Sequence, residues 1–160
     1  MTRPKDYPET VLEVIDDSLK FRPRALRAAR EFAEAGPWRG SIDERKGKFR
    51  RLNKSLAEVY GIIEPSLRFG LIDGSCSGRS HYMPTLHQIT LTGKLSVVTY
   101  LHEFAHARGM GERGACRWSI NLFRKIFPEQ FARLVGRAHM LIKPASIRRT
   151  NGGAQQGEQK

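Results

Sequence analysis

The sequence predicts an α+β fold that is mostly helical and contains a small sheet of two or three strands. Apolar residues recur at helical spacing through the first third of the chain and again from about residue 96 onward. Between these regions, segments 66–72 and 87–92 have the length and composition of short β-strands. The chain has 160 residues, which is enough for one domain to bury a hydrophobic core without cross-links.

Three helices are expected in the first third of the chain. Apolar residues at helical spacing predict a helix over 10–20 and another that begins at Pro23 and ends at the following Gly-Pro pair. Ser41 and Glu44 have the spacing of a capping box, in which each side chain bonds the other residue's backbone N–H. A third helix should therefore begin at Ser41 and run to about residue 60.

The two strands lie in the middle of the chain, and a further helix follows them. A strand is expected over 66–72 and a second over 87–92, with a Gly- and Ser-rich loop over 74–80 between them. Ser96 can accept a hydrogen bond from a free backbone N–H at a helix start. The sequence therefore predicts a helix over 96–108.

Two more helices and a polar tail complete the chain. The helices are expected over 112–127 and 129–141, with a proline between them. We expect an N-terminal helical region (1–62) and a core (63–143) that packs against it as one domain. The polar residues 144–160 are expected to be disordered, because they cannot bury enough apolar surface to offset the loss of chain entropy.

The charge is strongly positive and unevenly distributed. The formal net charge is +12, and residues 107–149 hold 10 basic and 2 acidic residues. This excess favours attraction to DNA or another polyanion, although a solvated basic surface without a partner would have the same composition.

The chain carries no sequence signal for a membrane or for the secretory pathway. It has no run of 18 apolar residues, no segment like a signal peptide, and only two cysteines, Cys76 and Cys116. We therefore expect a cytoplasmic protein with reduced thiols and no membrane partner.

The sequence His102-Glu103-Phe104-Ala105-His106 is the strongest functional signal in the chain. Two histidines four residues apart lie on one face of a helix, where both imidazoles can bind one metal ion. Glu103 projects about 100° around the helix axis from His102, so it can reach a water on the metal without being a ligand. Most other positions of this helix are apolar, which predicts a buried helix whose polar side chains need a partner such as a metal.

A catalytic zinc site has three protein ligands and one open position, so a third ligand must come from elsewhere. Glu112 is the preferred candidate, because Gly109 lets the chain turn back and Glu112 falls on the same inward face as Ala115. The helix dipole alone also explains an acidic residue at this helix start. The other candidates are His139, which is the main alternative, Cys116, which is more typical of a small core residue, and His81 and His87.

The pattern of His102, Glu103, His106 and Glu112 resembles the zincin-like metallopeptidases over about residues 80–128. The spacing through Gly109 is similar to that of the metzincins, but Glu112 stands where they have a third histidine, and no Met-turn is evident. A glutamate ligand on the following helix looks more like the gluzincins, whose spacing is longer. The SprT-like proteases, which act on proteins bound to DNA, are similar in their HExxH motif and basic character. Small zincin domains of bacteria and their mobile elements are similar in their short helical build.

The resemblance implies a minimal zincin-like domain that binds one zinc ion and hydrolyses peptide bonds. It implies that Glu103 is the general base for a zinc-activated water. It also implies that the strand at 87–92 holds an extended peptide or protein substrate by strand addition. Tyr82, His81 or Arg79 would then stabilise the oxyanion.

Arg113, Arg117 and Arg124 share one face of the helix predicted over 112–127, opposite its apolar seam. We expect them to be exposed and to be candidates for contacts with nucleic-acid phosphates. A second hypothesis is therefore a basic nucleic-acid-binding or regulatory protein with a structural or inactive zincin site. Glu103 favours the peptidase, because a structural zinc site needs no base beside its first histidine.

Overall fold

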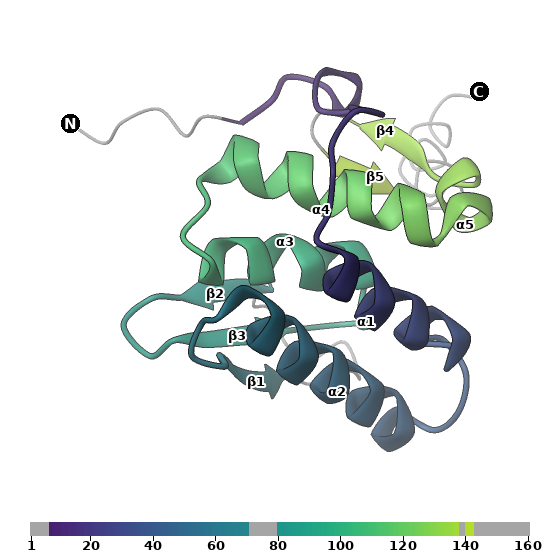
Figure 1. Cartoon of the computed structure of the whole chain (residues 1–160). Helices are drawn as coiled ribbons and strands as arrows, with labels where there is room; N and C mark the ends of the chain where they lie inside the picture. Colours follow the sequence, from purple (N-terminus) through teal and green to yellow (C-terminus); the bar gives the residue numbers. More distant parts are fainter. Residues whose placement is uncertain (1–6, 71–79, 138–139, 143–160) are drawn as a thin grey trace, which may run out of the picture.

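The computed structural model of the chain describes residues 7–70, 80–137 and 140–142. Helix α3 (Val97–Ala107) lies in the middle, with α4 (Glu112–Ile126) along one side and a small sheet along the other (Figure 1). Helices α1 (Pro23–Glu34) and α2 (Ile42–Tyr60) pack against each other, and α1 also contacts α4. The predicted α+β class, mostly helical with a small sheet, is confirmed.

The sheet has three strands, β1 (Ser66–Phe69), β2 (His81–Met83) and β3 (Gln88–Leu91). Their order is β1-β3-β2, with β3 parallel to β1 and antiparallel to β2. Because β3 is the central strand, both of its edges are already hydrogen-bonded. The prediction that residues 87–92 add a substrate strand is therefore wrong, and the edge strand nearest α3 is β2.

Two predicted helix starts and one predicted stop are confirmed at the atomic level. The Ser41 hydroxyl accepts a hydrogen bond from the Glu44 backbone N–H at 3.2 Å, and the Ser96 hydroxyl accepts one from Thr99 at 3.3 Å. Helix α2 ends at Gly61, whose φ of 62° is in the left-handed region that glycine adopts most easily.

The predicted helix over 10–20 is wrong. Only Val11–Glu13 forms one turn of 3-10 helix, η1. Residues 7–20, which include η1, pack against α4, and we call this segment the strap. Asp16 accepts hydrogen bonds from the backbone N–H and the hydroxyl of Ser18, at 2.9 and 2.5 Å, and these local bonds compete with helix formation.

The predicted helix over 129–141 is also wrong. A short helix α5 (Pro128–Ala132) is followed by a two-stranded antiparallel sheet of β4 (Val135–Arg137) and β5 (Met140–Ile142). Gly136 disfavours a helix, and β4 packs on η1 of the strap, a contact between distant parts of the chain.

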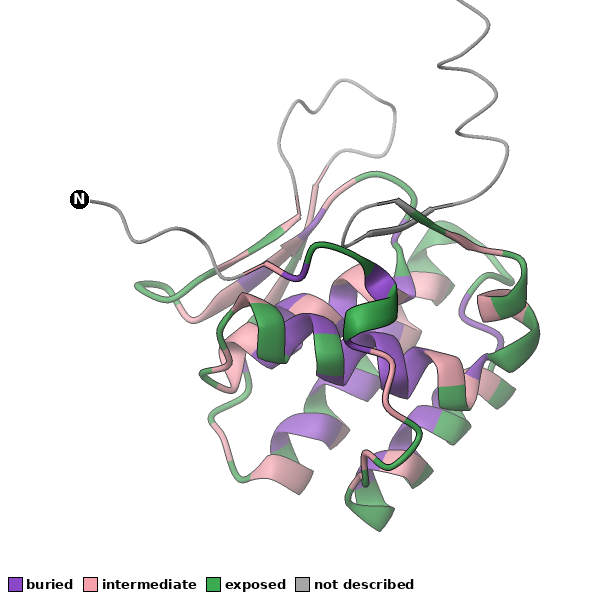
Figure 2. Cartoon of the chain, turned by 90° about the horizontal axis from the view of Figure 1, so that it is seen from above, coloured by how far each residue is buried: buried purple, intermediate pink, exposed green. Residues whose placement is uncertain are grey.

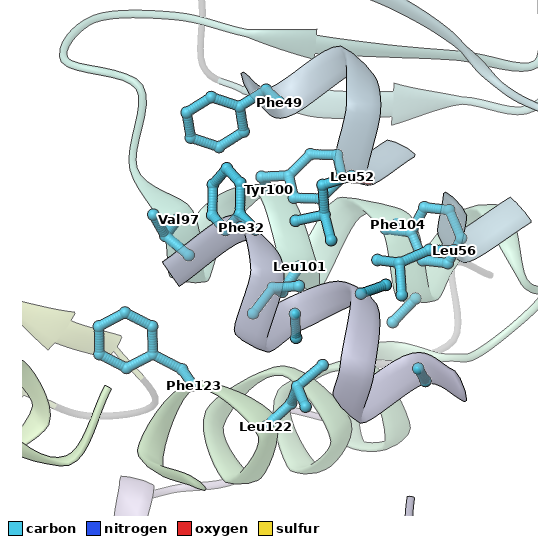
Figure 3. Close-up of a cluster of buried hydrophobic side chains, with 14 of the residues drawn as sticks. Phe32, Phe49, Leu52, Leu56, Val97, Tyr100, Leu101, Phe104, Leu122 and Phe123 are labelled. Carbon is cyan, nitrogen blue, oxygen red and sulfur yellow. The ribbon is translucent and has the colours of Figure 1, made fainter. Parts of the chain in front are cut away.

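One hydrophobic core joins residues from both predicted regions of the domain. Aromatic and aliphatic side chains of α1, α2, α3 and α4 meet in the centre (Figure 3), and the buried residues concentrate there (Figure 2). Two polar groups are satisfied inside it: the Tyr100 hydroxyl donates to Asn53 Oδ1 at 3.0 Å, and Asn53 Nδ2 donates to the Pro65 carbonyl at 2.8 Å. None of the helices in the described part of the chain is long and apolar enough to cross a membrane.

Candidate metal centre

Helix α3 places its polar residues in a largely apolar environment, as its sequence predicts. Val97, Tyr100, Leu101, Phe104 and Ala105 are buried, and the helix packs between α4 and strands β2 and β3. The remaining side presents the two histidines and the largely buried Glu103 to a cleft.

The structure brings the three predicted ligands, His102, His106 and Glu112, together. The two histidine Nε2 atoms are 3.1 Å apart, and Glu112 Oε2 is 3.2 Å from His102 Nε2 and 3.3 Å from His106 Nε2. Ligands at zinc–nitrogen and zinc–oxygen distances of about 2.05 Å, arranged tetrahedrally, are separated by about 3.3 Å. The three atoms therefore have the spacing of three corners of a zinc coordination tetrahedron.

No other group of three or more His, Cys, Asp and Glu side chains in the described residues comes close enough together to hold a metal ion. The side chains of His102, His106 and Glu112 are 21%, 18% and 23% exposed, so each is partly accessible from the cleft. A metal ion held by the three side chains could therefore be reached by water from the cleft.

The turn between α3 and α4 positions the third ligand. Gly109 has a φ of 91°, its N–H donates to the His106 carbonyl at 2.8 Å, and the Met110 N–H donates to the Ala105 carbonyl at 3.1 Å. These two bonds form a Schellman motif, in which the left-handed residue ends the helix. The chain then re-enters a helix at once, and Glu112 is the first residue of α4.

The same turn orients one of the histidines. The Met110 carbonyl accepts a hydrogen bond from His106 Nδ1 at 2.8 Å, which leaves the lone pair of neutral His106 on Nε2, facing Glu112. On the other histidine, Nδ1 lies 3.8 Å from the Cys116 thiol. Both Nε2 atoms thus point to the same place, and the tautomer of His106 suits metal binding.

Glu103 lies beside the ligands and is not one of them. Burial raises the pKa of the Glu103 carboxyl above its ordinary value, while His106 and a hydrogen bond from the Tyr82 backbone N–H act in the opposite direction. The backbone of β2 therefore holds the carboxylate of Glu103 at the edge of the cleft.

The cleft that contains these groups has a volume of about 830 Å³. Strand β2 contributes His81 and Tyr82 to one wall, and α4 contributes Cys116 and Ile120 to another. Tyr7 of the strap also lines it, and the sequence reasoning missed this residue. No local pattern marks it, because it reaches the cleft only through the path of the strap.

The other predicted site residues have different outcomes. The Tyr82 hydroxyl lies 2.7 Å from His87 Nδ1, and His87 Nε2 lies 2.6 Å from the Ile63 carbonyl. The carbonyl accepts from His87 Nε2, so in the neutral imidazole Nδ1 is the acceptor to which the Tyr82 hydroxyl can donate. His81 lines the cleft, whereas Arg79 and His139 lie outside the described residues, as does the tail over 144–160.

Cys116 is buried, as expected for a small core residue. It packs with Ile120 of α4 and with Val11 and Val14 of the strap. Burial raises the pKa of its thiol to about 11, so the thiol is protonated at neutral pH. Cys116 thus lies where the strap packs on the wall of the cleft.

Each of the three predicted nucleic-acid contacts on α4 is paired with an acidic residue of the strap. Arg113 pairs with Glu13, Arg117 with Asp16, and Arg124 with Asp17. The three arginines do share one face and are 37–48% exposed. A role for them in binding nucleic acid stays a prediction, and it would require each guanidinium to leave or share its carboxylate.

Comparison of the chain with protein-family models, with curated proteins and with solved structures finds no match in any of the three. The chemistry of the His–His–Glu group and of its cleft is therefore the basis for a function.

Proposed function

We propose that this chain is a zinc-dependent peptidase that binds one zinc ion through His102, His106 and Glu112. The observation that carries the proposal is the triangle of the three ligand atoms, with sides of 3.1–3.3 Å, beside a buried carboxylate that is not a ligand. Two nitrogens and one carboxylate oxygen form a donor set that zinc commonly takes in hydrolases. The zincin-like resemblance of the motif agrees with this donor set.

Zinc bound in such a site supplies Lewis acidity for the scissile carbonyl and lowers the pKa of a bound water. Glu103, beside the ligands, would act as the base that accepts a proton from water and donates it to the leaving amine. The hydrogen bond from the Tyr82 backbone N–H holds the Glu103 carboxylate in place for this transfer. His81, on the same strand and on the wall of the cleft, is the residue best placed to stabilise the oxyanion.

An extended peptide is the substrate that the walls of the cleft favour. Strand β2 lies at the edge of the sheet and contributes to the cleft, so the backbone groups of its outer edge that do not bond Glu103 can pair with a peptide. Such pairing would carry the peptide past Glu103 and the two histidines.

A structural zinc site is the competing hypothesis, and two features disfavour it. Structural sites are closed by four protein ligands, whereas the group found among the described residues has three, each partly exposed to the cleft. A structural site also does not require a buried carboxylate next to its first histidine.

Zinc content and hydrolysis, measured on the same preparations, test the proposal. Wild type should bind one zinc per chain and cleave an unfolded protein or a peptide library, and a chelator should abolish cleavage. Glu103→Gln should keep the zinc and lose cleavage by at least about a hundredfold, because the general base is gone. His102→Ala and Glu112→Ala should lose zinc.

The matched control is Glu34→Gln, which makes the same change at an exposed position at the end of α1. It should retain both zinc and activity. A Glu103→Gln protein that cleaves as fast as wild type would overturn the mechanism. A wild type that binds zinc and cleaves no peptide would favour the structural or regulatory alternative.

A further inference from the structure

Helices α4 and α2 both carry rows of basic side chains, and the α4 row is paired with carboxylates. On α4, the guanidinium groups of Arg113, Arg117 and Arg124 all pair with acidic residues of the strap. The strap holds four acidic residues and one basic one over 7–20, while α4 holds four basic and one acidic. The two segments therefore largely cancel each other's charge.

Helix α2 has no such partner. It holds six basic and three acidic residues over Ile42–Tyr60. Within the part of the chain that the structure describes, none of the six basic side chains forms an ion pair with a carboxylate. The six are Arg45, Lys46, Lys48, Arg50, Arg51 and Lys54.

Some of these cations are held in place by neutral groups, which leaves their charge uncompensated. Lys48 donates to the carbonyls of Gly36 and Arg39, and Arg45 donates to those of Pro37 and Lys94. The charged groups of Lys46 and Arg50 lie 5.6 and 5.0 Å from the centre of the Phe69 ring.

The unpaired cations form a regular row. Lys46, Arg50 and Lys54 are four residues apart, so they lie along one helix face at intervals of about 6 Å. Lys54 also borders a groove of about 390 Å³ between α1 and α2, together with Lys48 and Arg51. Glu31 and Glu58 line the same groove, so the cations outnumber the carboxylates there.

We propose that the α2 surface, formed by Lys46, Lys48, Arg50, Arg51 and Lys54, binds the phosphate backbone of nucleic acid. A row of uncompensated cations attracts a polyanion by Coulomb interaction and by release of its counterions. The α4 row would first have to break three internal ion pairs, which makes it the weaker site. This inference is independent of the metal centre, since α2 contributes no residue to the metal cleft.

Two triple variants that remove the same net charge test this assignment. One is Lys46→Gln, Arg50→Gln and Lys54→Gln on α2, and the other is Arg113→Gln, Arg117→Gln and Arg124→Gln on α4. The probes are a fluorescent duplex DNA and a single strand of the same sequence, titrated by anisotropy at several salt concentrations. Circular dichroism and thermal unfolding establish that each variant is folded.

Wild type should bind both probes at low salt, with an affinity that falls steeply as salt rises. The α2 variant should bind at least about tenfold more weakly at 100 mM salt, and the slope of log affinity against log salt should fall by about 3. The α4 variant should bind within about twofold of wild type. If it does not fold, Lys20→Gln, Lys125→Gln and Arg133→Gln, three exposed positions outside α2, provide the matched control.

Four results would overturn the proposal. The first two are that wild type binds no DNA at low salt, and that the α2 variant binds DNA as tightly as wild type. The third is that the α4 variant, or its replacement control, loses as much DNA affinity as the α2 variant. The fourth is that wild type binds vesicles of anionic lipid more tightly than either DNA probe. The last result would assign the α2 surface to a membrane instead.

Discussion

Replacing Gly109 with alanine tests the turn that connects the two metal-binding helices. Gly109 has a φ of 91°, and a Cβ added there would meet no atom within 4 Å. The cost of the substitution is therefore conformational rather than steric. An L-residue in the left-handed region costs about 1–2 kcal/mol, so Gly109→Ala should lower the free energy of unfolding by that amount. In a chain of this size this corresponds to a loss of about 2–8 °C in melting temperature.

The same substitution should weaken zinc binding. The turn brings the Met110 carbonyl to His106 Nδ1 and begins α4 at Glu112. A change in its conformation would therefore move the ligand Glu112 and also the carbonyl that orients His106. Loss of an orienting partner lowers metal affinity by about 10–100-fold, and we expect a loss near the lower end because no side chain is removed. Competition with a chromogenic chelator measures the affinity, and chemical unfolding without metal measures the stability.

Gly114→Ala is the matched control for Gly109→Ala. Gly114 lies five residues further along, exposed in the first turn of α4, and an added Cβ would make ordinary contact with Met110 at 3.6 Å. Alanine is favoured over glycine by about 0.5–1 kcal/mol inside a helix, so this variant should keep or gain stability, by no more than about that amount. Equal effects of the two substitutions, or unchanged stability in Gly109→Ala, would refute the conformational role of Gly109.

Two further predictions concern the strap. Hydrogen bonds from Ser18 and Arg117 lower the pKa of Asp16 from its ordinary value of 3.8 to about 2. The charged carboxylate of Asp16 therefore stabilises the fold above pH 3.8, and this contribution is lost as the pH falls towards 2. Asp16→Asn should therefore melt below wild type at pH 7 and approach it as the pH drops below about 4; a constant difference in melting temperature from pH 7 to pH 3 would contradict the assignment. Asn121→Ala removes the hydrogen bonds that Asn121 makes to the Asp16 N–H at 2.9 Å and to the Val14 carbonyl at 2.7 Å. It should lower the free energy of unfolding, measured in urea, by about 2–3 kcal/mol and should speed amide hydrogen exchange in the strap. A loss below about 0.5 kcal/mol would show that these bonds do not hold the strap on α4.

Several features of the site could be predicted because they depend on neighbouring residues in the chain. The spacing of His102 and His106 follows from the helical period, and the positions of Gly109 and Glu112 follow from how a helix ends and the next begins. The caps at Ser41 and Ser96 are predictable for the same reason, since a side chain there bonds a backbone N–H three residues away.

The wrong predictions concern elements whose partners lie far away in sequence. Residues 10–20 have helical spacing of apolar residues, but Val11 and Val14 are buried against α4, and Arg117 pairs with Asp16 across 101 residues. Strands β4 and β5 form in the segment where the sequence predicts a helix over 129–141, because β4 packs on the strap. Helical periodicity identifies an apolar face but does not say whether local or distant bonds will satisfy the backbone.

The sequence by itself determined the helix that carries the two histidines, the carboxylate beside them and the turn that leads to Glu112, because those relations extend over eleven residues of one chain segment. Only the tertiary structure decided which strand borders the cleft, that Tyr7 lines it, and which basic helix has its charge compensated. Whether a strand lies at the edge or in the centre of a sheet depends on segments that meet only when the chain folds. The same holds for whether a surface charge is paired.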